Sequence, residues 1–337
     1  MRYKWWWIIL LGLLVTYFLG PHPETPVYAT ALPTPPTDAA ALNQYVKALD
    51  AGHRLKPDNE ARIIWADSLE RPTEYSIVYL HGFTASQFEG APTHTNIARQ
   101  FGANLYLARL AEHGIDTSDA LANLTADKYW ASAKEALMIG NRIGKKLILM
   151  GTSTGATQAL QLAAAYPDKV YALVLLSPNI EINDPNAWLL NNHWGLQIAE
   201  LVKGGKFNRA ADDREKYKQY WSSPYRLEAA VALEEMLETT MLPAVFKQVK
   251  QPTLLLYYYK DAAHQDPVVR VSAMRNMFSL LGTADSLKTE KAMPLTGDHV
   301  IASPYKSEDA AGVEKEISRF LSQQLKIPQQ PLQITGN

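Results

Sequence analysis

The sequence contains no cysteine, which excludes disulfide bonds, a thiolate nucleophile and cysteine-ligated metal sites. It also lacks an excess of charge of either sign. There are 33 lysines and arginines against 34 aspartates and glutamates, for a formal net charge of −1. No dense basic run occurs anywhere along the chain. Because nucleic acids are bound by clustered positive charge, we expect no nucleic-acid partner.

The remaining composition is that of a globular chain. Hydrophobic residues make up 47% of the 337 residues and charged residues 20%, which argues against extended disorder. A chain of this length is long for one domain, but it is ordinary for an α/β fold.

The first twenty residues differ in character from the rest. Arg2 and Lys4 precede an uncharged apolar run from Trp5 to Leu19. This pattern predicts a secretory signal peptide or an uncleaved membrane anchor over residues 1–20. The run is shorter than the roughly 20 residues that span a bilayer, and the Ala-x-Ala cleavage pattern at 29–31 lies well beyond it. Both interpretations place the globular part outside the cytoplasm: membrane-anchored, or periplasmic or secreted.

Residues 21–37 are rich in proline and threonine. Such composition predicts a semi-rigid extended linker between the apolar segment and the folded body.

The body alternates strand and helix patterns. Expected strands are 62–65, 75–80, 104–107, 145–150, 170–176, 252–259 and 287–293, and expected helices are 38–49, 96–101, 126–143 and 157–165. This alternation predicts a doubly wound, mostly parallel sheet flanked by helices, formed by residues 38–179 and 251–326. Residues 327–337 are expected to form a tail.

Residues 180–250 interrupt the alternation. They combine tryptophans and tyrosines with charged residues, and Leu227 to Leu242 has a helical pattern. We interpret this stretch as an inserted helical cap that holds substrate, although its aromatic residues could equally be the core of the cap itself.

Gly151-Thr152-Ser153-Thr154-Gly155 follows a buried strand and precedes a helix. A serine at the apex of a sharp strand-to-helix turn is typical of a nucleophile elbow. The glycines would let strand and helix approach closely while Ser153 adopts a strained backbone conformation.

A serine nucleophile of this type requires a base and an acid, which follow it in the order acid, then histidine. Of the eight histidines, only His299 follows the loop that should supply the acid. That loop offers two candidates, Asp261 and Asp266. We favour Asp266, which precedes Pro-Val-Val at the start of the next helix, and in that case Asp261 caps a turn.

The oxyanion donors should be backbone N–H groups of Thr154, the residue after the nucleophile, and of Phe83, in the loop that follows the His81-Gly82 strand end. Glycine lets this loop approach the substrate carbonyl, and His81 is expected to act as structural support.

Four segments, 79–84, 151–155, 266–269 and 297–300, resemble the α/β-hydrolase superfamily, and within it the carboxylesterase and monoacylglycerol-lipase-type serine hydrolases. The resemblance spans about residues 60 to 326. It implies hydrolysis of a small-molecule carboxylic ester through an acyl-enzyme, without a cofactor or a metal. Ser153 would be the nucleophile, His299 the base and then the acid, and Asp266 its orienting partner. Acyltransferases and amidases share this triad, and a binding protein that retains the fold is a rival from another class.

Overall fold

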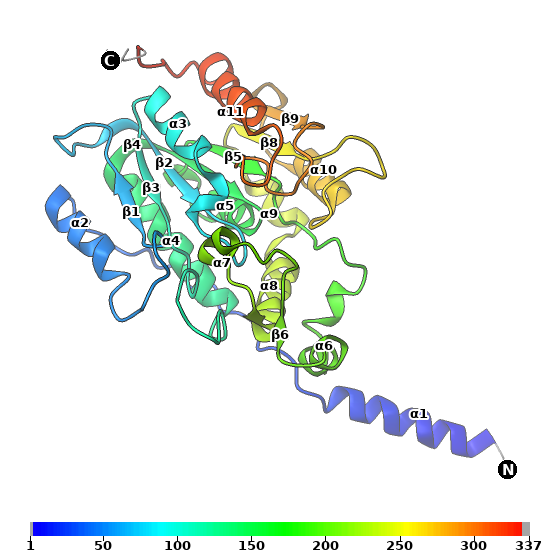
Figure 1. Cartoon of the computed structure of the whole chain (residues 1–337). Helices are drawn as coiled ribbons and strands as arrows, with labels where there is room; N and C mark the ends of the chain where they lie inside the picture. Colours follow the sequence, from blue (N-terminus) through cyan, green and yellow to red (C-terminus); the bar gives the residue numbers. More distant parts are fainter. Residues whose placement is uncertain (1–2, 332–337) are drawn as a thin grey trace.

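The computed structural model describes residues 3–331, which form an α/β core, a cap and an N-terminal helix that projects from the body (Figure 1). The core contains a seven-stranded sheet in the order β1-β3-β2-β4-β5-β8-β9. Its strands are β1 (Arg62–Ile64), β2 (Thr73–Leu80), β3 (Asn104–Leu107), β4 (Gly144–Thr152), β5 (Ala172–Leu176), β8 (Thr253–Tyr257) and β9 (Lys288–Ala292).

All neighbouring strands of this sheet run parallel except β1, which pairs antiparallel with β3. The predicted mostly parallel, doubly wound sheet is therefore confirmed. The central strands β5 and β8 are near-continuous apolar runs, buried throughout, because helices cover both faces of the sheet. Successive residues alternate between the faces: Val78 and Leu80 of β2 join one apolar cluster, and Ile77 and Tyr79 join the other.

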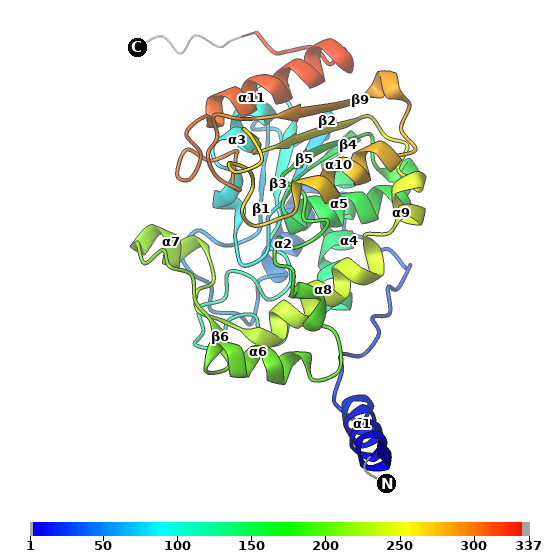
Figure 2. The same ribbon diagram turned by 90° about the vertical axis from the view of Figure 1, so that its right-hand side faces the viewer.

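Helices α4 (Ala126–Ile143) and α5 (Thr154–Ala165) cover one face, while α3 (Thr93–Gln100) and α11 (Ala310–Arg319) cover the other (Figure 2). The helix α4 has the predicted bounds, with Thr125 accepting from the Lys128 N–H as its N-cap. Helix α3 begins three residues before its predicted start at Asn96, directly after Pro92, which suits the beginning of a helix because its φ is restricted and it lacks an N–H. Buried residues of α2 (Ala39–Ala48) and α10 (Val271–Leu280) join the same apolar cluster as α4 and α5.

The carboxyl ends of the parallel strands bring four loops to one edge of the sheet. Leu80, at the end of β2, pairs with Gly151 of β4, and Thr152 of β4 pairs with Leu176 of β5. The strands β8 and β9 end side by side, with Tyr257 opposite Ala292. The loops that carry the predicted oxyanion donors, nucleophile, acid and histidine therefore all leave the same edge, where doubly wound sheets bind ligands.

The segment between β5 and β8 forms the cap. It contains α6 (Gly195–Lys203), α7 (Glu215–Tyr220), α8 (Leu227–Thr240), α9 (Pro243–Gln248) and the antiparallel pair β6 (Phe207–Asn208) and β7 (Tyr225–Arg226). The cap is therefore helical with one small strand pair. Its C-terminal part is built into the core, because Met236, Leu237, Met241 and Phe246 belong to the same buried cluster as α4 and α5.

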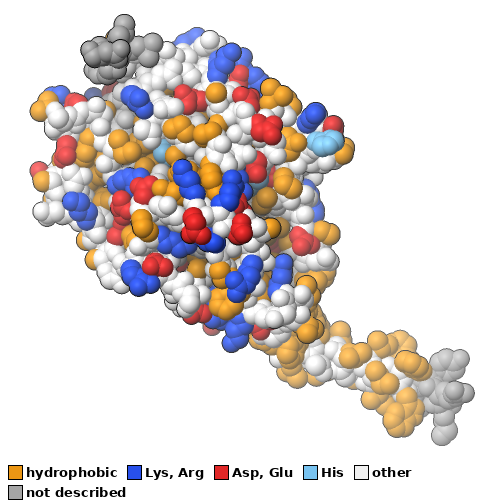
Figure 3. All heavy atoms as spheres, in the orientation of Figure 1, with side chains coloured by type: hydrophobic (Ala, Val, Ile, Leu, Met, Phe, Trp, Pro, Cys, Tyr) orange, Lys and Arg blue, Asp and Glu red, His pale blue; other side chains and the backbone are white. Residues whose placement is uncertain are grey.

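The apolar N-terminal run forms α1 (Tyr3–Phe18), whose hydrophobic side chains are exposed from Trp5 to Phe18 (Figure 3). Within residues 3–331, none of the helices combines the length and apolar character that crossing a membrane requires. The membrane anchor predicted for residues 1–20 is thus not supported by α1, which has 16 residues. Arg2 of the predicted basic flank, and residues 332–337 of the predicted tail, lie outside the described residues.

Residues 21–36 of the predicted linker form neither helix nor strand, as an extended segment should, but they lie along the body. The carbonyls of Ala29 and Ala31 accept hydrogen bonds of 2.7 Å from Nζ of Lys134, a buried residue of α4. Trp130 Nε1 also donates to Ala29 O, and the hydroxyl of Tyr28 lies 2.7 Å from that of Thr239. Composition predicted the extended backbone but not the donors on α4 that hold it.

Replacing Gly155 by alanine is expected to lower the free energy of unfolding by about 3 kcal/mol or more. An alanine Cβ would lie 2.0 Å from the Leu80 carbonyl oxygen and 2.7 Å from that of His81, and backbone atoms at this junction cannot move aside. Urea denaturation measures the change. The matched control is Gly12→Ala in α1, where no atom lies within 4 Å of the added Cβ. Equal stability of the Gly155 variant and the native protein would contradict this packing.

Candidate active site

Ser153 occupies the turn between β4 and α5 with φ 54° and ψ −121°, a conformation that non-glycine residues rarely adopt. Its N–H donates to Leu176 O, and its carbonyl accepts from the Asn179 N–H, so that the turn is held from the end of β5. A Cβ on Gly151 would lie 2.6 Å from the Ala156 nitrogen. The predicted strand, turn and helix are therefore present, and both glycines are required by close backbone approach.

Asp266 and His299 form a buried pair. Nδ1 of His299 lies 2.7 Å from Oδ2 of Asp266, and the two residues are 7% and 1% exposed. The other carboxylate oxygen of Asp266 accepts from the backbone N–H groups of Val268 and Val269. The carboxylate is thus fixed by the residues that follow it in the loop, and its second oxygen is directed at the histidine ring.

The environment of His299 favours its protonated form. Burial alone would lower the pKa of the imidazole. The charge of Asp266 and its hydrogen bond, together with the charges of Glu89 and Asp298, outweigh burial and raise the pKa above the ordinary histidine value. His299 is therefore a stronger base than a free imidazole.

Asp261, the alternative acid, lies apart from this pair. Its side chain is exposed and accepts from the N–H groups of Ala263 and His264 and from the His264 ring, all within its own loop. That hydrogen bonding to His264 lowers the pKa of Asp261. The structure thus gives Asp261 the turn-capping position and places Asp266 at the histidine.

Ser153 and His299 line the same cavity, although no hydrogen bond among the described residues joins Ser153 Oγ to the His299 ring. The predicted oxyanion donors face no competing acceptor. The Phe83 N–H donates to none of the residues in the described range. Thr154 is the first residue of α5, where N–H groups have no partner inside the helix.

Two neutral histidines support the loop that carries Phe83. His81 Nε2 accepts from the Leu110 N–H, so its Nδ1 donates to the Gly82 carbonyl at 2.9 Å. His113 Nε2 accepts from the N–H of Thr84, whose φ of 65° marks the tightest point of the loop. Burial lowers the pKa of His81 to about 4 and that of His113 well below its usual value. His81 thus occupies the supporting position that the sequence predicts.

Sequence reasoning missed Glu89. This residue lies in a short 3-10 helix, Gln87–Gly90, which follows the Phe83 loop, and its carboxylate accepts a 2.7 Å hydrogen bond from the Gly82 N–H. It is 3% exposed and lines the cavity of Ser153 and His299. The sequence does show an acidic residue seven positions after Gly82 of the His-Gly motif. The segment that carries it is too short to show a helical or strand period.

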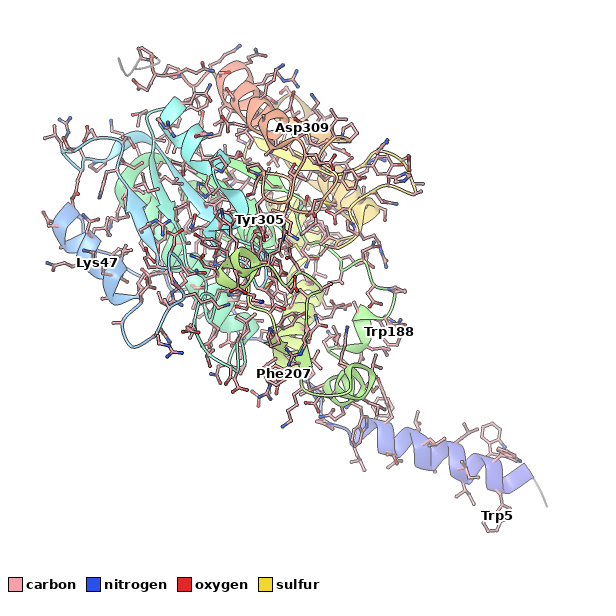
Figure 4. All side chains as sticks on the ribbon, viewed as in Figure 1. Trp5, Lys47, Trp188, Phe207, Tyr305 and Asp309 are labelled. Carbon is pink, nitrogen blue, oxygen red and sulfur yellow. The ribbon has the colours of Figure 1, made fainter. Side chains whose placement is uncertain are left out.

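A cavity of about 700 Å³ extends from Ser153 and His299 to the cap. The cap side is mostly apolar and includes α6 and the segment before it, from which exposed Trp188 projects (Figure 4). Cap residues that line the cavity include Leu189, Leu190, Ile198, Val202, Tyr217, Trp221, Tyr225, Leu227 and Leu233. Of the cap tryptophans noted in the sequence, Trp221 faces the cavity.

The family model described as serine aminopeptidase, S33, matches residues 126–292, which include Ser153 and Asp266. No curated protein sequence matches the chain significantly.

Solved structures show the same fold. The chain is similar to a structure of the metagenome-derived lipolytic enzymes LipS and LipT, with a TM-score of 0.63 and 16% identity over 80% of this chain and 99% of that one. It is similar to the monoacylglycerol lipase of Paleococcus ferrophilus, with a TM-score of 0.56 and 16% identity over 78% and 98%. It is also similar to a thermophilic esterase from Thermogutta terrifontis, with a TM-score of 0.52 and 17% identity over 79% of this chain and 94% of that one. The sheet order, the nucleophile-elbow turn and these similarities show that the chain has the α/β-hydrolase fold.

Proposed function

We propose that the chain is a serine hydrolase that cleaves carboxylic esters through an acyl-enzyme on Ser153. The observation that carries this proposal is the buried His299–Asp266 pair, with Nδ1 and Oδ2 2.7 Å apart, whose histidine lines the same cavity as Ser153. His299 would accept the Ser153 proton and return it to the leaving alcohol, while Asp266 holds the ring in the tautomer that this requires. The Phe83 and Thr154 N–H groups would stabilise the oxyanion.

The substrate side of the proposal rests on the cavity. Its largely apolar cap wall supports a substrate with an apolar acyl group, because ligand pockets combine apolar lining with a few polar groups at the reacting centre. Hydrolysis of p-nitrophenyl esters from acetate to laurate tests this. We expect Ser153-dependent release of acid, with the highest kcat/KM for an acyl chain longer than acetate. A folded protein that cleaves none of the esters would overturn the proposal.

Amide hydrolysis is the second candidate, favoured by the aminopeptidase description of the matching family model. A p-nitroanilide series compared with the matching esters separates the two activities. Adding a competing alcohol to the ester assay would reveal acyl transfer, because the transferred ester then appears in place of free acid.

The pH dependence of hydrolysis follows from the raised pKa of His299. The base must be neutral to accept the serine proton, so kcat/KM should fall as the pH decreases through the pKa of His299. Because Asp266, Glu89 and Asp298 raise that pKa, we expect the acidic limb to be centred above 6.5, the ordinary histidine value. A limb centred at or below that value, measured on a non-ionising ester, would contradict this account of the site.

We further propose that the protein is exported, on the strength of the apolar segment behind Arg2 and Lys4. The contacts of Lys134 favour a mature chain that retains residues 21–36, because cleavage after Ala31 would remove both carbonyls to which its buried ammonium donates. Cell fractionation with N-terminal sequencing of the purified protein tests both parts. A cytoplasmic protein would refute export, and a chain beginning at Leu32 would refute retention.

A further inference from the structure

Glu89 is a buried carboxylate that the triad does not use. An alanine Cβ placed on Gly82 would lie 2.9 Å from Glu89 Oε1 and 3.0 Å from Ser153 Cβ, so the carboxylate and the serine flank the same glycine. Glu89 enters from the segment between β2 and α3. A buried carboxylate is costly unless it is hydrogen-bonded, and its hydrogen bond here comes from the Gly82 N–H.

Hydrogen bonds hold two successive peptide groups of the loop that carries Phe83. The peptide between His81 and Gly82 donates its N–H to Glu89. The next peptide, between Gly82 and Phe83, accepts at its carbonyl from His81 Nδ1 and from the Ala85 N–H. In a trans peptide the N–H points opposite to the carbonyl, so the second set of hydrogen bonds directs the Phe83 N–H away from His81. Glu89 fixes the plane of the preceding peptide group, between His81 and Gly82.

We propose that Glu89 is a positioning residue of the hydrolytic site, which holds the Gly82 peptide so that the Phe83 N–H faces the oxyanion and which, when ionised, adds negative charge to the cavity that His299 lines. This inference rests on the proposed function. It concerns the orientation of a donor and the basicity of the histidine, and it gives Glu89 no part in the proton transfers.

The electrostatic part of the role follows from the groups around Glu89. Burial raises the pKa of Glu89 to about 7, against the Gly82 N–H and the charge of His299, which lower it. In return, the charge of Glu89 contributes to the raised pKa of His299. The titratable groups that face Glu89 are His299 and Asp298 from the loop after β9, Tyr79 from β2, Tyr129 from α4 and Tyr217 from α7.

Two substitutions separate the hydrogen bond from the charge. Glu89→Ala removes both, and we expect kcat to fall between about tenfold and a hundredfold, with KM changed by less than about twofold, because a misdirected donor weakens only transition-state binding. Glu89→Gln keeps an oxygen that can accept from the Gly82 N–H, and we expect it to restore most of kcat. In both variants the acidic limb should move to lower pH, since a charge that raises the pKa of His299 is gone.

The matched control is Glu234→Gln. Glu234 is also a buried carboxylate whose pKa burial raises to about 7, but it lines a different cavity, beside Met241 and Phe246. This control should leave kcat and the acidic limb unchanged. Rates are expressed per serine titrated with a fluorophosphonate, so that loss of folded protein does not count as loss of turnover.

An unchanged kcat per titrated site in Glu89→Ala, equal kcat in the two Glu89 variants, or an unmoved acidic limb would each overturn the role of Glu89. These results are distinct from failure of the proposed function, in which the native protein itself shows no Ser153-dependent ester hydrolysis and no labelling of Ser153.

Discussion

Replacing Ser153 by alanine is expected to lower kcat on a p-nitrophenyl ester by about a millionfold, close to loss of all turnover. Ser153 is the one side chain at the apex of the elbow, and its strained φ of 54° is maintained by the Leu176 and Asn179 hydrogen bonds, whatever side chain it carries. Alanine should therefore leave the fold and the cavity intact while removing the atom that attacks the ester. Steady-state hydrolysis and circular dichroism together measure both parts.

The control for this substitution is Ser303→Ala. Ser303 is also buried, its hydroxyl has no partner within residues 3–331, and it lies outside the cavity of Ser153. We expect this variant to retain native activity. Ester hydrolysis that survives Ser153→Ala at more than a few per cent would show that another group performs the chemistry.

Replacing Asp266 by asparagine is expected to lower kcat by about ten thousandfold, whereas Asp261→Asn should change it by less than about twofold. The asparagine amide can keep the acceptor for Val268 and Val269 through its oxygen, but its nitrogen then faces His299 Nδ1 and donates where the carboxylate accepted. The ring would be driven into the tautomer that cannot take the serine proton. It would also lose the charge that raises its pKa.

The two aspartates form a matched pair for this experiment, because they lie in one loop after β8 and differ in what they contact. Asp261 binds only its own turn and His264, while Asp266 binds His299. Thermal unfolding of both variants checks that the loop remains folded. A larger loss in Asp261→Asn than in Asp266→Asn would contradict the geometry of the site.

The order of strands and helices could be predicted from the sequence because most of the core strands are continuous apolar runs, and α4 shows a clear helical period. Ser153, Asp266 and His299 could be placed because each follows a strand of recognisable pattern, and parallel strands end at one edge. The sequence favours Asp266 over Asp261 but does not exclude Asp261, since both follow β8. Only the hydrogen bond to His299 in three dimensions separates them.

Features that depend on contacts between distant segments could not be predicted. The segment from 21 to 36 reads as a linker because proline and threonine suit extended chain, and nothing local shows that Lys134, about a hundred residues away, donates to its carbonyls. Glu89 was missed for a similar reason. Acidic residues are usually solvated at the surface, and its burial arises from the packing of its 3-10 helix against Gly82.

The measurement that tests the account most directly is labelling of the native protein with a fluorophosphonate, followed by peptide mass spectrometry. The account predicts one adduct per chain, on the peptide that contains Ser153, and no adduct in Ser153→Ala. It also predicts that labelling slows below the acidic limb, as His299 becomes protonated. A folded, ester-hydrolysing protein that is labelled elsewhere, or not at all, would contradict the central claim that Ser153 is the nucleophile of this protein.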